Sequence, residues 1–255
     1  MKIGDKILCP VFTITHIISP TIFEKETLFN IVTIRGKNYL RTEVTKEDVG
    51  RPYRDILLKF KMFCTGLSVA TVGHFWVEDI LMDESLKVIW GEKKAILLLK
   101  GKELLNSGPD PLRVEQFRWG KQLIGWIALE YPRVFLYHSM GLYLLRVPTY
   151  GDVYPDALLN FFKIVEIVTY KRTMKKAQLK VILAEARNLD IKVLDEREIK
   201  KYYEIRGRDV AHDWGKSKPI DREDVINCKH LAEEFIISDR HKRIKKVESG
   251  MGVKP

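Results

Sequence analysis

Cysteine is scarce in this sequence of 255 residues, which holds only three. Cys9, Cys64 and Cys228 lie far apart, and no two of them form a CxxC pair. A disulfide framework needs paired cysteines and a zinc site needs closely spaced ligands, so the pattern suggests neither. We therefore expect a protein of the reducing cytoplasm. The N-terminal region also shows no nucleotide-binding loop or metal-ligand cluster, and we expect no metal and no cofactor.

Long apolar runs are also missing. One of the longest, Ala95 to Leu99, is far too short to span a bilayer, and the N-terminus lacks the pattern of a signal segment. No internal repeat or low-complexity segment is present. The sequence thus predicts a soluble protein without a membrane partner, and its length allows two ordinary domains.

Positive charge is what the sequence has in excess. Its 44 Lys and Arg residues against 34 Asp and Glu residues give a formal net charge of +10. Such a balance favours polyanionic partners such as nucleic acid. A basic surface that is only solvated explains the charge equally well.

The first hundred residues carry patterns typical of strands. Over residues 11–18, apolar and polar side chains alternate as they do in a strand with one buried face. Residues 28–34 and 38–43 flank a turn-like Arg-Gly-Lys, which predicts a hairpin, and residues 86–90 and 95–99 predict a second one.

Two further segments of this region have other patterns. Residues 56–80 are ambiguous between helix and strand. Residues 112–130 predict a helix, because Asp110 can cap its first turn and Pro111 is tolerated there. The expected buried face of that helix consists of Trp119, Leu123, Trp126 and Ile127.

From Pro155 onward the pattern is helical, after a Pro- and Gly-containing linker at 147–152. The first helix has a wide apolar stripe, which predicts a central position in a bundle. A second helix is expected around residues 179–186, a third from a capping box at Asp195 into Arg206, and a fourth after Asp221. The predicted fold class is α+β, with a mixed β-rich domain over 1–150, a helical bundle over 151–246 and a basic, flexible tail over 247–255.

The third helix ends on a pair of residues suited to phosphate chemistry. Arg206 and His212 are separated by five residues and precede a glycine. Histidine can take up and return a proton near neutral pH, and the arginine fork matches phosphate oxygens. Arg133 and His138 have a similar spacing, but they lie in an apolar run that reads as a strand, so we interpret that match as chance.

Four helices with this motif closing the third resemble the HEPN superfamily, whose signature is Arg, four to six residues, then His. The resemblance covers roughly residues 152 to 240. Gly207 stands where the family commonly has Asn, and Arg208 offers a second register with His212. The family resemblance implies a metal-independent endoribonuclease that works as a homodimer, as a toxin or antiviral defence effector, with an antitoxin or an activating ligand as a further partner.

The resemblance also implies roles for particular residues. His212 would move the proton of a 2′-hydroxyl or of the leaving oxygen, and Arg206 would stabilise charge on the phosphate. Glu166 would orient one of them by hydrogen bonding. Apart from the resemblance, three further residues are candidate RNA contacts: Arg208, Trp214 and Lys216. For Trp214 a role in capping the core fits equally well.

Each role has a structural alternative. Arg206 and His212 can cap helix carbonyls, and Glu166 can form a buried structural pair with an arginine. Tyr202 and Tyr203 suit base stacking or the core. For the whole chain, the alternative is a non-catalytic module that binds RNA, a nucleotide or a partner protein, with residues 1–150 as a sensor or an RNA-positioning domain.

Overall fold

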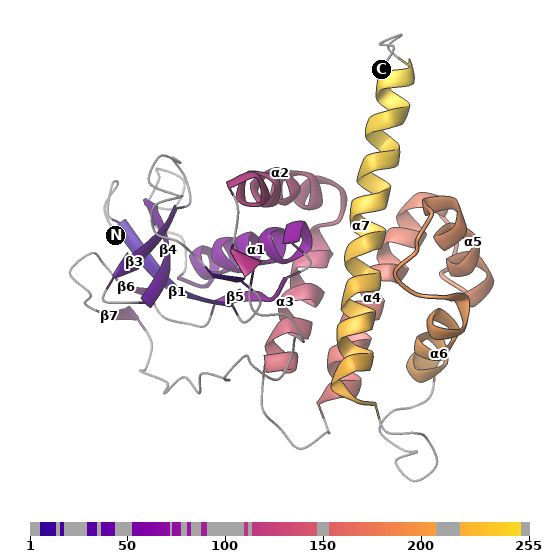
Figure 1. The fold of residues 1–255 in the computed structure, drawn as a ribbon, viewed down its shortest axis with the longest axis horizontal. Coiled ribbons are helices and arrows are strands. Elements are labelled where there is room, and N and C mark those ends of the chain that lie inside the picture. The colour runs from indigo at the N-terminus through magenta and orange to yellow at the C-terminus, as the bar shows by residue number, and fades with distance from the viewer. Residues whose placement is uncertain are drawn as a thin grey trace. The chain divides into compact units, whose positions relative to one another are not determined.

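A computed structural model gives the fold of the chain (Figure 1). The described residues are 6–13, 16–17, 30–34, 37–43, 53–71, 73–77, 81–82, 88–90, 110–111, 114–146, 153–207 and 220–250. Contacts within the chain divide it into two units, residues 1–128 and 129–255.

The first unit contains a sheet with the strand order β3-β4-β1-β6-β7, and β5 also pairs with β1. The strands are β1 (Lys6–Thr13), β3 (Asn30–Ile34), β4 (Lys37–Glu43), β5 (Phe75–Val77), β6 (Leu81–Met82) and β7 (Val88–Trp90). Two short strands, β2 (His16–Ile17) and β8 (Asp110–Pro111), pair in parallel. β3 and β4 form the antiparallel hairpin expected around the Arg-Gly-Lys turn. Of the second predicted hairpin, residues 91–99 lie outside the described residues.

Two helices accompany this sheet. α1 (Tyr53–Thr71) occupies most of the segment whose pattern was ambiguous, and α2 (Val114–Glu130) is the predicted helix after Pro111. They approach closely through glycines, because a Cβ on Gly66 would lie 2.6 Å from the Gly120 carbonyl oxygen. On α2, the Leu123 and Ile127 side chains are fully buried, whereas both tryptophans of the predicted face are only partly buried.

The predicted α+β class, with a β-rich domain over residues 1–150, is wrong. Where the structure describes side chains, the chain is almost entirely helical, and three helices fall inside that range. The run around Arg133 and His138, interpreted as a strand, belongs to helix α3 (Pro132–Arg146). The buried residues Val134, His138, Leu142 and Leu145 recur at spacings of three and four, which is the helical period.

The second unit is built of helices in its described part (Figure 1). α3 precedes the four helices that the sequence predicted, and these are confirmed: α4 (Tyr154–Thr173), α5 (Leu179–Leu189), α6 (Glu196–Gly207) and α7 (Arg222–Gly250). α4 contacts each of the other four helices, so it is the centre of the bundle as its apolar stripe predicted. The unit begins before the predicted boundary at 150, because α3 packs on α4.

The predicted helix starts are confirmed by their hydrogen bonds. The Asp195 Oδ1 atom accepts the backbone N–H groups of Arg197 and Glu198 at 2.8 and 2.9 Å, and Glu198 Oε2 accepts the Asp195 N–H at 3.2 Å. This is the reciprocal capping box, with Asp as the cap. Asp221 Oδ1 accepts the Asp224 N–H at 2.9 Å and starts α7 in the same way.

The basic stretch after residue 239 is helical rather than a separate tail. α7 runs without interruption to Gly250, since no proline or glycine breaks it before that residue. Arg243 Nε lies 3.0 Å from Asp239 Oδ2 one turn earlier, a spacing that supports the helix. The predicted tail at 247–255 thus begins inside α7, and residues 251–255 lie outside the described residues.

Three polar side chains form a buried triad, His138 on α3 with Lys229 and Glu233 on α7. Their exposed fractions are 0%, 0% and 1%. Glu233 accepts hydrogen bonds from His138 Nε2 at 2.9 Å and from Lys229 Nζ at 2.8 Å. The His138 ring also meets Phe161 of α4 edge-on at 5.6 Å between ring centroids. The triad therefore connects α3 with α7, and the His138 ring also packs against α4.

The triad should make stability depend on pH. Burial lowers the pKa of His138 in the folded protein, although Glu233 opposes the shift. The unfolded imidazole titrates near pH 6.5, at about its ordinary pKa. Below that pH the unfolded chain gains a proton that the folded chain does not, so the free energy of unfolding should fall as the pH drops below about 6.5.

Urea unfolding at about pH 7.5 and 5.5 tests this dependence. The loss of stability between the two pH values should be smaller in His138→Gln than in the wild type. His241→Gln, a change at an exposed position of α7, should keep the wild-type loss. An equal loss in all three proteins would contradict the role of His138.

Candidate functional site

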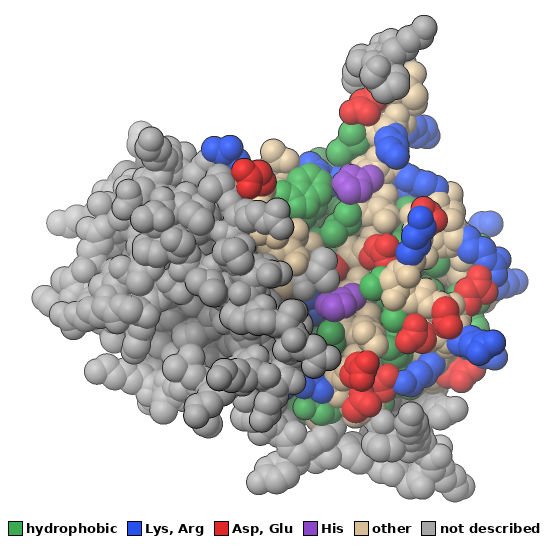
Figure 2. Space-filling model, in the orientation of Figure 1, with side chains coloured by type: hydrophobic (Ala, Val, Ile, Leu, Met, Phe, Trp, Pro, Cys, Tyr) green, Lys and Arg blue, Asp and Glu red, His purple; other side chains and the backbone are tan. Residues whose placement is uncertain are grey.

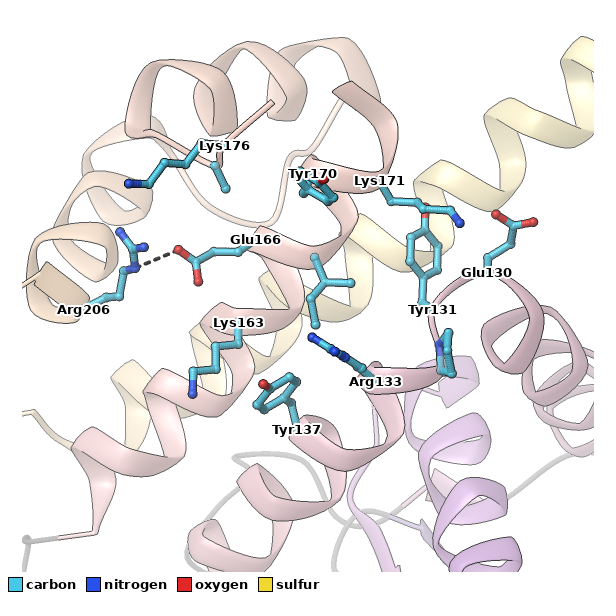
Figure 3. A pocket seen from close by; sticks show the side chains of 13 residues that line it. Glu130, Tyr131, Arg133, Tyr137, Lys163, Glu166, Tyr170, Lys171, Lys176 and Arg206 are labelled. Atoms are coloured by element: carbon cyan, nitrogen blue, oxygen red, sulfur yellow. Dashed lines mark ion pairs between the residues drawn. The ribbon is translucent and has the colours of Figure 1, made fainter. Parts of the chain in front are cut away.

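A groove with a volume of about 620 Å³ opens on the second unit (Figure 3). We call it the α4 groove, because one side of α4 supplies Lys163, Glu166, Ile167, Tyr170 and Lys171 to its lining. These positions recur every three or four residues and so share one helix face. The buried side chains Phe161, Phe162, Val165 and Val168 occupy other faces of the same helix.

The remaining lining comes from the helices around α4. Tyr131, Pro132, Arg133 and Tyr137 belong to α3 and the residue before it, and Lys176 lies between α4 and α5. Arg206 enters from the last turn of α6. Five cations and two carboxylates line the groove, together with three tyrosines. Proteins that bind single-stranded nucleic acid combine cations and aromatic rings in this way.

Arg206 and Glu166 meet at one end of this groove. Arg206 Nε lies 2.7 Å from Glu166 Oε1, and the two side chains are 33% and 19% exposed. Glu166 Oε1 is buried and accepts no hydrogen bond from a described residue, so the contact is an ion pair without hydrogen-bond alignment. Burial raises the pKa of Glu166, while Arg206 and Lys163 act in the opposite direction. A carboxyl group with a raised pKa beside an arginine can share in proton transfer as well as hold charge.

A ring beneath Arg206 fixes it further. The guanidinium carbon lies 5.1 Å from the centroid of the Tyr203 ring, within the range of a cation–π contact. Tyr203 in turn meets the buried Phe162 of α4 edge-on, with 6.3 Å between ring centroids. Arg206 is thus held from α4 and from its own helix, and its exposed part faces the groove (Figure 3).

The structure places only some of the residues that the sequence predicted for the site. It brings Glu166 and Arg206 together. His212, Arg208, Trp214 and Lys216 lie outside the described residues. The Tyr202 side chain is 1% exposed and belongs to the core, and Tyr203 supports Arg206.

Comparison with known proteins adds no family. No family model, curated protein or solved structure matches this chain. The HEPN resemblance therefore stays a hypothesis that rests on the sequence motif and the helical setting. None of the described helices is long and apolar enough to cross a membrane.

The fold separates Arg133 from His138, the two residues of the second Arg-to-His match. Arg133 lines the α4 groove with an exposed side chain, whereas His138 lies in the buried triad. The two residues are therefore not parts of one site. Arg133 itself is a groove residue that the sequence interpretation missed.

Sequence reasoning also missed Lys163, Tyr170 and Lys171. All three lie on the polar edge of the apolar stripe of α4, at helical spacing from Glu166. This periodicity could have grouped them with Glu166 once the helix was assigned. Elsewhere, on the face of the second unit drawn in Figure 2, basic and acidic side chains alternate, which is typical of a solvated surface.

Proposed function

We propose that this protein is a metal-independent endoribonuclease of HEPN type, acting in the cytoplasm and cutting RNA in the α4 groove. The observation that supports the proposal is the placement of Arg206. It is an arginine held by Glu166 and Tyr203, with its exposed part toward a groove rich in cations. A pre-oriented guanidinium is well suited to charge that develops on a phosphate.

The proposed reaction is an internal transfer of the phosphate. The 2′-oxygen attacks phosphorus while the bond to the 5′-oxygen breaks, which leaves a cyclic phosphate end and a 5′-hydroxyl end. His212 would take the proton from the 2′-hydroxyl or give one to the leaving oxygen. Arg206 would stabilise the charge on the phosphate, and Glu166 would be a positioning residue for Arg206. A second copy of the chain would supply a second motif, as in the HEPN superfamily.

Loss of cleavage in Arg206→Ala is the expected result of the first test. Purified protein is incubated with a mixed RNA pool in excess chelator, and the product ends are identified. Arg206→Ala and His212→Ala should each slow cleavage by at least about a hundredfold, because each removes a group that acts on the reacting phosphate. Lys192→Ala, a change at an exposed lysine away from the groove, should cut like the wild type.

The outcomes separate the two functions. Cleavage that persists in both variants would mean that other residues carry the reaction. RNA binding without any cleavage by the wild type would favour the non-catalytic binding module. A sedimentation equilibrium measurement that finds only monomer at working concentrations would remove the composite site of two motifs.

A further inference from the structure

The α4 groove extends well beyond the Arg206 end. Lys163 and Lys171 lie eight positions apart on α4, which corresponds to about 12 Å along the helix. Glu166 and Arg206 lie toward the first of these lysines, and Glu130 and Tyr131 lie near the second (Figure 3). Cleavage at one phosphate uses only part of this length.

The carboxylates in the lining of the groove do not neutralise its cations. Of its two carboxylates, Glu166 pairs with Arg206, and Glu130 pairs at 2.7 Å with Arg243, a cation outside the lining. Arg133, Lys171 and Lys176 are exposed and form no ion pair with any described residue. A ligand with several negative charges would therefore be attracted along the whole groove.

Tyr170 provides an aromatic surface next to these cations. Its side chain lines the groove but is 51% exposed. The Tyr170 hydroxyl and ring have no hydrogen bond or ring contact with another described residue. Tyr137, by contrast, already has the Lys163 ammonium 5.0 Å from its ring centroid. An exposed ring between cations is a surface on which a nucleobase can stack.

We propose that the α4 groove binds unpaired nucleotides flanking the cleaved phosphate, with Tyr170 stacking on a base and Lys171 and Arg133 contacting the backbone. This inference rests on the proposed function for the identity of the ligand as RNA. A base can lie on Tyr170 only when it is free of a paired partner, so the groove selects single-stranded RNA over a duplex.

The test measures binding apart from cleavage. All proteins carry His212→Ala, and the probe is a fluorescein-labelled oligouridine of about ten nucleotides, followed by fluorescence anisotropy at fixed salt. Tyr170→Ala should weaken binding about tenfold, and Tyr170→Phe should restore it because the ring remains. Tyr143→Ala is the matched control, since Tyr143 is 50% exposed on α3 and does not line the groove. The same oligouridine annealed to oligoadenine should bind more weakly and should respond little to Tyr170→Ala.

The results separate failure of this inference from failure of the proposed endoribonuclease activity. Unchanged affinity in Tyr170→Ala, or an equal loss in Tyr143→Ala, would overturn the stacking role even if the wild type cleaves RNA. Equal affinity for the duplex would overturn the selection of unpaired nucleotides. A specific loss in Tyr170→Ala from a protein whose parent does not cleave RNA would support binding of unpaired RNA in the α4 groove, while the proposed endoribonuclease activity fails.

Discussion

Replacing Glu233 with alanine is expected to lower the free energy of unfolding by about 3–5 kcal/mol. Glu233 is the shared acceptor of the buried triad, and its loss leaves the fully buried Lys229 without its ion-pair partner. Burial pushes the pKa of Lys229 down and Glu233 opposes that shift, so the variant lysine would favour its neutral form. His138 would lose its hydrogen bond at the same time.

The measurement is urea unfolding followed by far-ultraviolet circular dichroism, which reports the helical content of the chain. Glu248→Ala on the exposed end of α7 is the matched control and should change stability by less than about 0.5 kcal/mol. The double variant Lys229→Met with Glu233→Leu should recover part of the loss, because an apolar pair replaces the ion pair while His138 still lacks its acceptor. A loss below about 1 kcal/mol in Glu233→Ala would contradict a stabilising role of the triad.

A second large loss, again about 3–5 kcal/mol, is expected for Asp239→Ala. Asp239 is fully buried on α7 and accepts hydrogen bonds from the Tyr131 hydroxyl and from Arg172 of α4. Arg243 Nε lies 3.0 Å from its Oδ2 atom. Removing this carboxylate leaves a buried hydroxyl and two arginines short of an acceptor, which costs more than the lost contacts alone.

The same unfolding assay can divide this effect into charge and hydrogen bonding. Asp239→Asn keeps one acceptor oxygen, so its loss of stability should lie between the wild type and Asp239→Ala. Glu204→Ala is the control, because its contact with Lys200 is exposed and 3.8 Å long. Equal losses in the Asn and Ala variants would indicate that the negative charge carries the whole effect, and no loss in either would contradict the network.

The helices of residues 154–250 were predictable because their signals are local. Asp195 and Asp221 provide caps that need only the next few residues, and the apolar stripe of α4 repeats with the helical period. The contact between Glu166 and Arg206 followed from a family resemblance rather than from these patterns. The α4 groove was not predicted, because its lining comes from helices far apart in the sequence.

α3 shows why residues 1–150 were harder to predict. Val134, Phe135 and Tyr137 are residues with a preference for strands, and Gly141 is a poor helix former. Tertiary packing decides in favour of the helix. A Cβ on Gly141 would lie 2.6 Å from the Phe161 ring, so the glycine lets α3 approach α4 closely. That requirement cannot be seen in the residues around Gly141 alone.

α4 supplies both the centre of the bundle and one wall of the groove, on separate faces of a single helix. Substitutions at Lys163, Tyr170 or Lys171 change exposed side chains, while Phe161 and Val165 stay in the core. Exposed positions are usually tolerant, so ligand preference can diverge among descendants of this chain without a matching cost in folding. The helical repeat thus lets selection act on recognition and on stability as two independent traits.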